Sequence, residues 1–308
     1  MTGTLLDHVA LRPRWFLKQL LSLDVSKATG PDALPARILK EVSHEIFKAF
    51  ARLCTRIVEE GHWPNSWREY NLVPIYKRLS VFDPNHYRGV HITSILSKVA
   101  ERVIGAPLLR MFETHDSFGN HQWAYRKQRS SKDLITLLMC SWIFAFCCGN
   151  CVGAFLSDIA GAFDRVFTPF LLSKLCEQGL GAKYLRFLTS YLVPRSGYVC
   201  VGGKKSLPIL LADQVFQGTV LGPPLWNMFF KDVVSAIVAP NTGKVFADDL
   251  NVFRKFDRRT DKDHIVSELH RCQEKVHAWR QKNRVSFDPA KEAFVIMHPR
   301  NGWGDSFK

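Results

Sequence analysis

The sequence lacks several features that mark other classes of protein. Its eight cysteines have no regular spacing, unlike the disulfide framework of a small secreted domain, and this favours a reducing compartment. No basic and then apolar series opens the chain, so we expect no signal peptide and an intracellular protein, nuclear or cytoplasmic. The charge-free stretch 137–156 is just long enough to cross a bilayer, but Gly149 and Asn150 interrupt it. A buried helix followed by a buried strand fits it better, and we expect no contact with a membrane.

Acidic residues are few relative to basic ones. The chain has 42 Lys and Arg against 28 Asp and Glu, a net charge of +14. This balance favours a polyanionic partner, and nucleic acid is the default, although a basic protein can also lack such a partner. With 308 residues and 46% hydrophobic content, the chain can bury a large core in one large domain or two subdomains.

Apolar spacing and capping residues predict alternating helices and strands. Helical spacing runs over 35–61, and further helices are expected to begin near Ser94, Ser130, Thr168 and Gly222. Strand-like runs lie at 72–77, 153–159, 197–202, 244–253 and 293–298. Because helices separate the last four runs, they predict an α+β fold whose sheet is covered by helices on one face.

Acidic residues stand at two strand ends. Asp248 and Asp249 occupy a tight hairpin tip between the strand-like stretches 243–245 and 250–253, and Asp158 ends the apolar run that starts at Ala154. Carboxylates are ligands for Mg²⁺, and these three would suit a pair of such ions, or Mn²⁺, for phosphoryl chemistry. Asp164, six residues after Asp158, is expected to be structural.

Seven blocks of sequence together resemble the reverse transcriptases of non-LTR (LINE-type) retrotransposons. They cover residues 26–41, 87–105, 121–136, 155–167, 215–231, 246–250 and 283–292. One block alone would be a weak match, but seven in this order are poorly explained by chance. The resemblance implies a right-hand polymerase fold with fingers mainly in 24–150 and a palm with an antiparallel sheet mainly in 151–298. Residues 1–23 are then a lead-in, the thumb is expected to be missing, and 299–308 are expected to be a truncated end.

The resemblance also implies an activity, RNA-directed DNA polymerisation. The 3′-hydroxyl of a DNA primer, paired with an RNA template, attacks the α-phosphate of a deoxynucleotide, helped by two metal ions. By this resemblance Asp158 and Asp248 bridge the metals, and Asp249 lies beside them as a third carboxylate. Lys291 resembles the lysine that protonates the leaving pyrophosphate as a general acid.

Further residues are assigned to substrates by the same resemblance. Those expected to bind the nucleotide are Arg88, Lys77, Ala162, Phe163, Gln217 and Gly218. The fork of Arg88 suits the triphosphate, and Phe163 resembles the aromatic gate that clashes with a ribose 2′-hydroxyl. Arg126, Lys127 and Arg129 alternate with aromatic residues and suit a template strand, although the same pattern fits a solvated face.

Two positions depart from the family pattern. Gly89 stands where the block after Arg88 usually has proline, and Phe246 stands where tyrosine is usual before the acid pair. Together with the expected lack of a thumb, they support an alternative hypothesis, a truncated and catalytically inactive remnant that still binds nucleic acid. A splicing maturase would need an RNA-binding extension, and Phe163 argues against a polymerase of ribonucleotides.

Overall fold

The computed structural model describes residues 11–299 and 305–307, which fall into two compact units, each built from two stretches of the chain. Unit 1 comprises the described residues up to Ser117 together with Phe167–Leu225. Unit 2 comprises Phe118–Val166 and the described residues from Trp226 onward. The division therefore falls at other places than the single boundary near residue 150 that is expected between fingers and palm.

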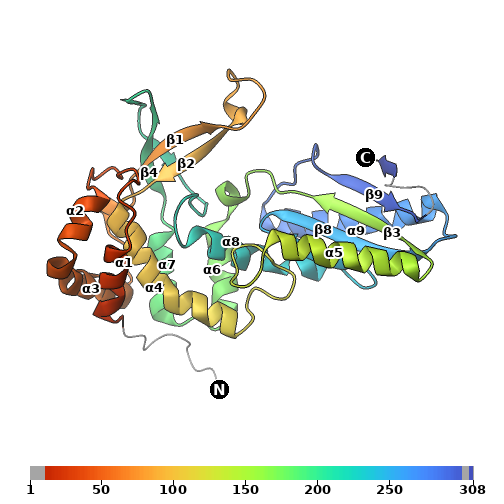
Figure 1. The fold of residues 1–308 in the computed structure, drawn as a ribbon, viewed down its shortest axis with the longest axis horizontal. Coiled ribbons are helices and arrows are strands. Elements are labelled where there is room, and N and C mark those ends of the chain that lie inside the picture. Colours follow the sequence, from red (N-terminus) through yellow and green to blue (C-terminus); the bar gives the residue numbers. More distant parts are fainter. Residues whose placement is uncertain (1–10, 300–304, 308) are drawn as a thin grey trace. The chain divides into compact units, whose positions relative to one another are not determined.

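Unit 1 holds most of the helices. They are α1 (Pro13–Leu21), α2 (Ala36–Glu41), α3 (Ser43–Glu60), α4 (Ile95–Thr114), α6 (Thr168–Glu177) and α7 (Ala182–Tyr191) (Figure 1). The helix starts expected near Ser94 and Thr168 are confirmed. The single helix expected over 35–61 is wrong, because the backbone at Val42 leaves helical geometry, with φ −88° and ψ 15°, between α2 and α3. Gly61 ends α3 with a φ of 67°, as the sequence predicts.

The sheet of unit 1 corrects the expected topology. Its strands are β1 (Tyr70–Tyr76), β2 (Tyr87–Ile92), β4 (Arg195–Val201), β5 (Lys204–Lys205) and β6 (Ile209–Leu211). They follow the order β2-β1-β4-β5, with β6 also on β4, and β4 runs parallel to β1. The run at 197–202 thus belongs here and not with the run at 153–159. Gly197 permits the pairing with Tyr70, because a Cβ at Gly197 would lie 2.3 Å from the Tyr70 carbonyl oxygen.

Unit 2 contains an antiparallel sheet. Its strands are β3 (Asn150–Ser157), β7 (Thr242–Phe246), β8 (Asp249–Asp257), β9 (Ala293–Met297) and β10 (Asp305–Phe307). Their order is β10-β9-β3-β8-β7, and each neighbouring pair is antiparallel. The helices are α5 (Ser131–Cys147), α9 (Lys262–Asn283) and the part of α8 (Gly222–Phe230) from Trp226 onward. The predicted antiparallel sheet is therefore confirmed for these strands.

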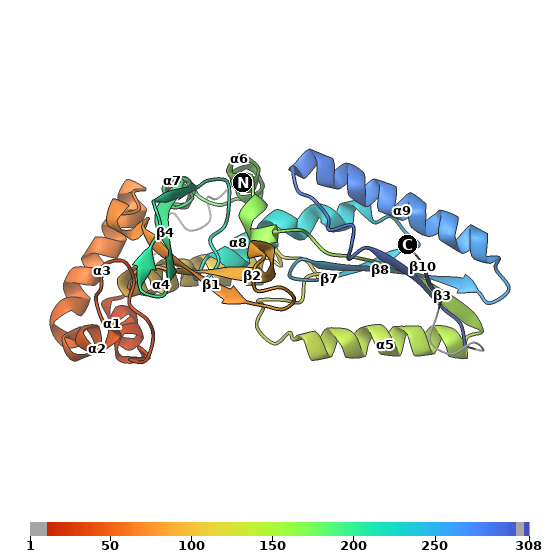
Figure 2. The same ribbon diagram turned by 90° about the horizontal axis from the view of Figure 1, so that it is seen from above.

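Helices cover both faces of this sheet, so the expectation of helices on one face is wrong. Figure 2 shows α5 and α9 on opposite sides of the strands. Val152 and Ala154 of β3 belong to the core cluster under α5. The intervening Gly153 faces the opposite side of the sheet, where a Cβ would meet the side chains of Ile265 and Leu269 of α9. Successive strand residues face opposite sides, and since both sides of β3 are apolar, both need a cover.

Helix α5 is less buried than the sequence predicts. Ile135, Ile143 and Phe144 are 57%, 53% and 62% exposed, because only one side of the helix meets the sheet. The interruption at Gly149, with a φ of 77°, separates α5 from β3 as expected. Within the part of the chain that the structure describes, no helix has the length and apolar character needed to cross a membrane.

A buried pair of opposite charges lies in the core of unit 1. Glu101 on α4 is fully buried, and its carboxylate accepts the N–H groups of Val220 and Leu221 at 2.6 and 3.1 Å. Arg195 is only 1% exposed, and its guanidinium carbon lies 4.0 Å from the centre of the Phe216 ring. Burial raises the pKa of Glu101, while the charge of Arg195 and the two N–H bonds act against that rise. The two charges therefore depend on each other inside the core.

We predict that Glu101→Gln lowers the free energy of unfolding by about 3 kcal/mol, because it leaves the buried charge of Arg195 without compensation. Urea unfolding followed by circular dichroism measures the change. Glu45→Gln, at an exposed position of α3, is the control and should unfold at the wild-type midpoint. Equal midpoints for Glu101→Gln and the wild-type chain would contradict the prediction.

Candidate active site

The acid pair lies at the tip of the β7–β8 hairpin in unit 2. Phe246 and Asp249 form the last pair of the hairpin, so Ala247 and Asp248 are its two-residue turn. Ala247 adopts a φ of 57°, the left-handed conformation that tight hairpin turns use. The predicted hairpin tip is confirmed, with Asp249 as the first residue of β8.

Two buried side chains from elsewhere in unit 2 hold this turn. Gln122 accepts the N–H of Ala247 at 3.0 Å and donates its amide to the Ala247 carbonyl at 3.2 Å. The indole of Trp226 donates to the same carbonyl at 3.0 Å. Sequence reasoning missed both residues as contributors to the site, although both lie in matched blocks. The signal available in the sequence was the single glutamine next to the aromatic Trp123, because a side-chain amide that becomes buried needs a hydrogen-bond partner.

The third acid comes from the neighbouring strand. Because β3 pairs with β8 through Ser157 and Leu250, Asp158 immediately after β3 lies beside the hairpin tip. Asp158 is buried, and its carboxyl group is close enough to that of Asp248 for a hydrogen bond between them. The structure thus brings together acids that are 90 residues apart in the sequence (248 minus 158).

The charges at this site perturb one another. Burial, followed by the negative charges of Asp158 and Asp249, raises the pKa of Asp248 to about 6. Burial and then the charge of Asp158 also raise the pKa of Asp249, with Lys291 acting against that rise. The ammonium group of Lys291 forms an ion pair with Asp158, and that hydrogen bond raises the pKa of the lysine. The acids therefore favour positive charge in their neighbourhood.

A cleft of about 350 Å³ adjoins the acids within unit 2. Asp158, Asp249 and Lys291 line it, together with Phe246 of the hairpin. Residues of the first turns of α5, beginning at Ser131, also line it. A substrate in this cleft would lie directly against two of the three carboxylates.

The oxygen ligands at this site fit a hard divalent cation such as Mg²⁺. Within residues 11–299 and 305–307, no three His, Cys, Asp or Glu side chains form a ready-made metal cage. Mg²⁺ is commonly bound by only one or two carboxylates, with water and substrate phosphates as its other ligands. Asp158 and Asp248, whose mutual repulsion a cation would relieve, match that mode of binding.

Phe163 and Ala162 lie close to the residues that hold the hairpin. Both belong to a short 3₁₀ helix, Ala162–Arg165, that follows β3 in the chain. The Phe163 ring stacks on Trp226 with ring centres 5.9 Å apart and meets the edge of Tyr125 at 6.3 Å. Because Trp226 also bonds to Ala247, the position of Phe163 is tied to that of the turn.

The predicted template residues have contacts within their own loop. Arg126 donates to the carbonyl of Gly119, and Arg129 donates to the carbonyl of Gln122 at 3.1 Å. Both arginines thus help to shape the loop that carries Gln122. Lys127 is exposed. Contact of these three residues with a template remains a prediction.

Lys77 and Arg88 lie in unit 1, on the β1–β2 hairpin. Lys77 directly follows β1, and Arg88 is the second residue of β2. Gly89, the departure from the family pattern, pairs with Pro74. A Cβ at Gly89 would lie only 2.8 Å from the side chain of Leu72. The glycine therefore leaves room for the packing of Leu72 in this hairpin.

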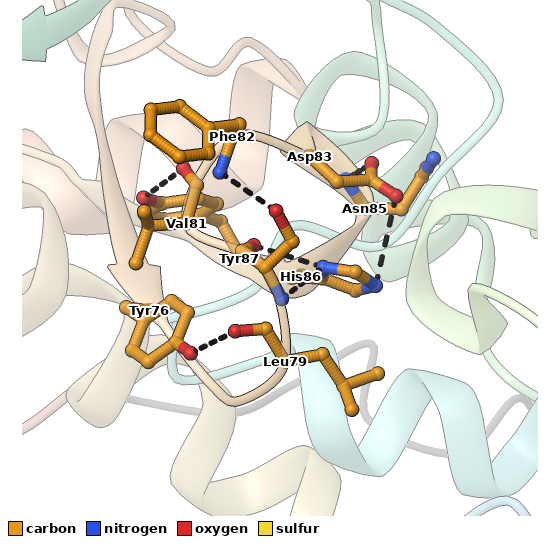
Figure 3. Close-up of polar contacts among 9 residues, drawn as sticks. Tyr76, Leu79, Val81, Phe82, Asp83, Asn85, His86 and Tyr87 are labelled. Atoms are coloured by element: carbon orange, nitrogen blue, oxygen red, sulfur yellow. Dashed lines mark hydrogen bonds and ion pairs between the residues drawn. The ribbon is translucent and has the colours of Figure 1, made fainter.

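The loop that joins β1 and β2 is held by its own side chains (Figure 3). The hydroxyl of Tyr76 donates to the carbonyl of Leu79, and the hydroxyl of Tyr87 donates to the carbonyl of Val81 at 2.8 Å. These bonds fix the loop and leave the side chain of Phe82 93% exposed at its tip.

Gln217 and Gly218 also belong to unit 1, in the loop before α8. The imidazole Nδ1 of His91 donates to the Gln217 carbonyl at 3.1 Å, and burial lowers the pKa of His91 to about 4. Gly218 has a φ of 85°, and a Cβ there would lie 2.7 Å from the His91 carbonyl oxygen. With Glu101 bonded to the next part of the loop, buried polar groups hold this loop at two places.

The facing carboxylates define a candidate site for metal-assisted phosphoryl transfer. A family model described as reverse transcriptase (RNA-dependent DNA polymerase) matches residues 76–305, and the chain belongs to this family. The resemblance to non-LTR retrotransposon proteins is confirmed by its relatives.

Three relatives come from insect mobile elements. The chain is 28% identical to the RNA-directed DNA polymerase from mobile element jockey of Drosophila melanogaster, over 93% of this chain and 32% of the relative. It is 26% identical to the probable RNA-directed DNA polymerase from transposon X-element of the same species, over 82% and 28%. It is 24% identical to the retrovirus-related Pol polyprotein from type-1 retrotransposable element R1 of Bradysia coprophila, over 89% and 27%. The chain spans about a third of the length of these relatives or less.

We predict that Gln122→Leu lowers the free energy of unfolding by about 2 kcal/mol, because it removes both bonds to Ala247 while nearly keeping the side-chain volume. Urea unfolding measures the loss, and hydrogen exchange at the Ala247 amide should become faster. Gln281→Leu, at an exposed position of α9 in the same unit, is the control. Unchanged exchange at Ala247 would show that Gln122 does not hold the turn.

The raised pKa of Asp248 predicts a pH dependence of stability. Between the ordinary value of 3.8 and about 6, the folded chain binds this proton more tightly than the unfolded chain does. The free energy of unfolding contributed by Asp248 therefore falls as pH rises through that window. In the absence of divalent cations, Asp248→Asn should be more stable than wild type at pH 7, by about 1 to 2 kcal/mol, and similar to it at pH 4.

Thermal unfolding of both chains across this pH range tests the sign. Asp263→Asn, at an exposed position in the first turn of α9, serves as the control for losing one carboxylate. Lower stability of Asp248→Asn than of wild type at pH 7 would contradict the inferred repulsion.

Proposed function

We propose that this chain provides the catalytic part of an RNA-directed DNA polymerase, which extends a DNA primer with deoxynucleotides on an RNA template. The observation that carries the proposal is the pair of facing carboxylates, Asp158 and Asp248, at adjacent strand ends in a member of the reverse transcriptase family. In this proposal the antiparallel sheet of unit 2 is the palm, and the β1–β2 hairpin of unit 1 belongs to the fingers.

The divalent ion would be Mg²⁺, or Mn²⁺ in its place, held by Asp158 and Asp248 with Asp249 adjacent. When bound there, a pair of such ions would supply acidification of the primer hydroxyl and neutralisation of the triphosphate charge. The chain contributes the fixed positions of the carboxylates, directly after β3 and on the β7–β8 turn. Lys291 keeps a proton on its ammonium group beside Asp158 and within the cleft, which suits a general acid for the leaving pyrophosphate.

The other predicted residues have proposed roles with substrates. Phe163 would exclude a 2′-hydroxyl from the sugar, and its stacking on Trp226 supports a fixed ring position for that purpose. Ala162, Gln217 and Gly218 would contact the nucleotide, and Arg88 and Lys77 its triphosphate. Arg126, Lys127 and Arg129 would contact the template strand.

Extension of a labelled DNA primer on an RNA template, with Mg²⁺ and deoxynucleotides, tests the proposal. We predict that the wild-type chain extends the primer and that Asp248→Asn lowers the rate by about two orders of magnitude or more, because it removes a carboxylate that would hold the divalent ion. Asp263→Asn should keep the wild-type rate.

Two other outcomes are informative. Equal rates for wild type and Asp248→Asn would contradict the role of this carboxylate in metal binding. Binding of primer and template by the wild-type chain with no extension at any Mg²⁺ or Mn²⁺ concentration would instead support the alternative, an inactive remnant that binds nucleic acid.

A further inference from the structure

A second cleft, of about 540 Å³, lies within unit 1 between α1 and α4, and none of the residues assigned above lines it. Its apolar lining residues include Val103, Pro107 and Met111. It is also lined by Trp15 and by the basic residues Lys18, Arg102 and Arg110. Among the described residues that line it there is no Asp or Glu. The cleft therefore combines an aromatic surface with basic side chains.

The positive charge continues along α4 beyond the cleft. Lys98, Arg102 and Arg110 are separated by four and eight residues, so they follow a line along α4 that turns by about 120° around the helix axis. Each step of four residues advances about 6 Å along the axis, which gives a row of charges about 18 Å long. Burial lowers the pKa of Lys98, the negative charge of Glu101 acts against that fall, and the positive charges of Arg102 and Lys27 add to it. A polyanion along this row would relieve that repulsion.

The acidic side chain next to this row acts on Lys98 from within the core. Glu101 adjoins Arg102 in the sequence, but its carboxylate is buried and bonded to Val220 and Leu221 in the core. Helix α1 contains no acidic residue, and the side chains of Arg102, Arg110 and Lys18 are exposed. The basic side chains are thus available to a ligand at the surface of unit 1.

We propose that this cleft binds a single-stranded segment of RNA, with phosphates on Lys18, Arg102 and Arg110 and a base against Trp15. Bases stack on aromatic side chains when they are unpaired, and guanidinium groups match phosphate oxygens. The choice of RNA over other polyanions rests on the proposed function. The site lies on α1 and α4 of unit 1, whereas the candidate catalytic acids lie in unit 2.

The test compares two triple variants of the full chain that lose the same charge. The first is Lys18→Gln with Arg102→Gln and Arg110→Gln. The control changes three exposed residues of α2 and α3 outside the cleft: Arg37→Gln, Lys40→Gln and Arg52→Gln. Binding of a fluorescent oligouridine is measured at several salt concentrations. Loss of three phosphate contacts should reduce the slope of log affinity against log salt by about 2, while the control keeps the wild-type slope.

The aromatic contact has its own measurement. Trp15→Leu keeps an apolar side chain but removes the indole, and it should weaken binding about tenfold, the loss of one stacked base. Irradiation of oligouridine that contains 5-bromouridine should attach RNA to the peptide with Trp15.

A deoxyuridine oligomer of equal length shows whether the sugar matters, and equal binding would assign the site to single strands of either kind. Competition by polyglutamate without any RNA cross-link would indicate an acidic peptide instead and overturn the proposal.

Primer extension on a template with a short unpaired end separates this proposal from the proposed function. We expect the cleft variant to extend at the wild-type rate while it loses affinity for oligouridine. Extension by wild type, with equal RNA binding by the cleft and control variants, would overturn the cleft and leave the polymerase standing. Absence of extension, with a reduced salt slope in the cleft variant alone, would overturn the polymerase and leave the cleft standing.

Discussion

The closeness of Asp158 and Asp248 is the constraint on which the candidate active site depends. Two carboxylates in a partly buried place repel each other, and the raised pKa of Asp248 reflects that cost. The pairing of β3 with β8 holds their backbones together, and Gln122 and Trp226 fix the turn that carries Asp248. Gln122 and Trp226 are neutral and do not offset this repulsion, whereas the ammonium group of Lys291 pairs with Asp158 and offsets part of the negative charge.

Unit 1 fixes its own candidate nucleotide loop by the same physical means. The loop with Gln217 is bonded to His91 at one place and to Glu101 at another, and both of these groups are buried. In each unit, buried polar side chains far away in the sequence hold a short loop with few backbone bonds of its own. Substitutions at such positions should therefore act through loop geometry, and the effect on stability distinguishes them from residues that touch substrate.

Local signals in the sequence predicted local structure well. Ser94 and Ser130 start helices because their hydroxyls accept a backbone N–H of the first turn, and this depends on neighbours within three residues. Strand partners were less predictable, since pairing joins distant segments. The run at 197–202 pairs with β1 because Gly197 permits close approach to Tyr70, and no pattern within the run itself shows this. Coverage of both sheet faces likewise required the packing of α9 on Gly153.

The sequence by itself determined the residue types and the order of the matched blocks, and with them the family and the three candidate acids. Those properties are carried by the covalent chain. The tertiary structure decided which acids face each other, that the turn depends on Gln122, and that Arg126 and Arg129 are engaged in their own loop. It also placed Lys18 of α1 opposite the arginines of α4 to form a basic cleft. These features arise from burial and from contacts between residues far apart in the chain, and both exist only once the units have folded.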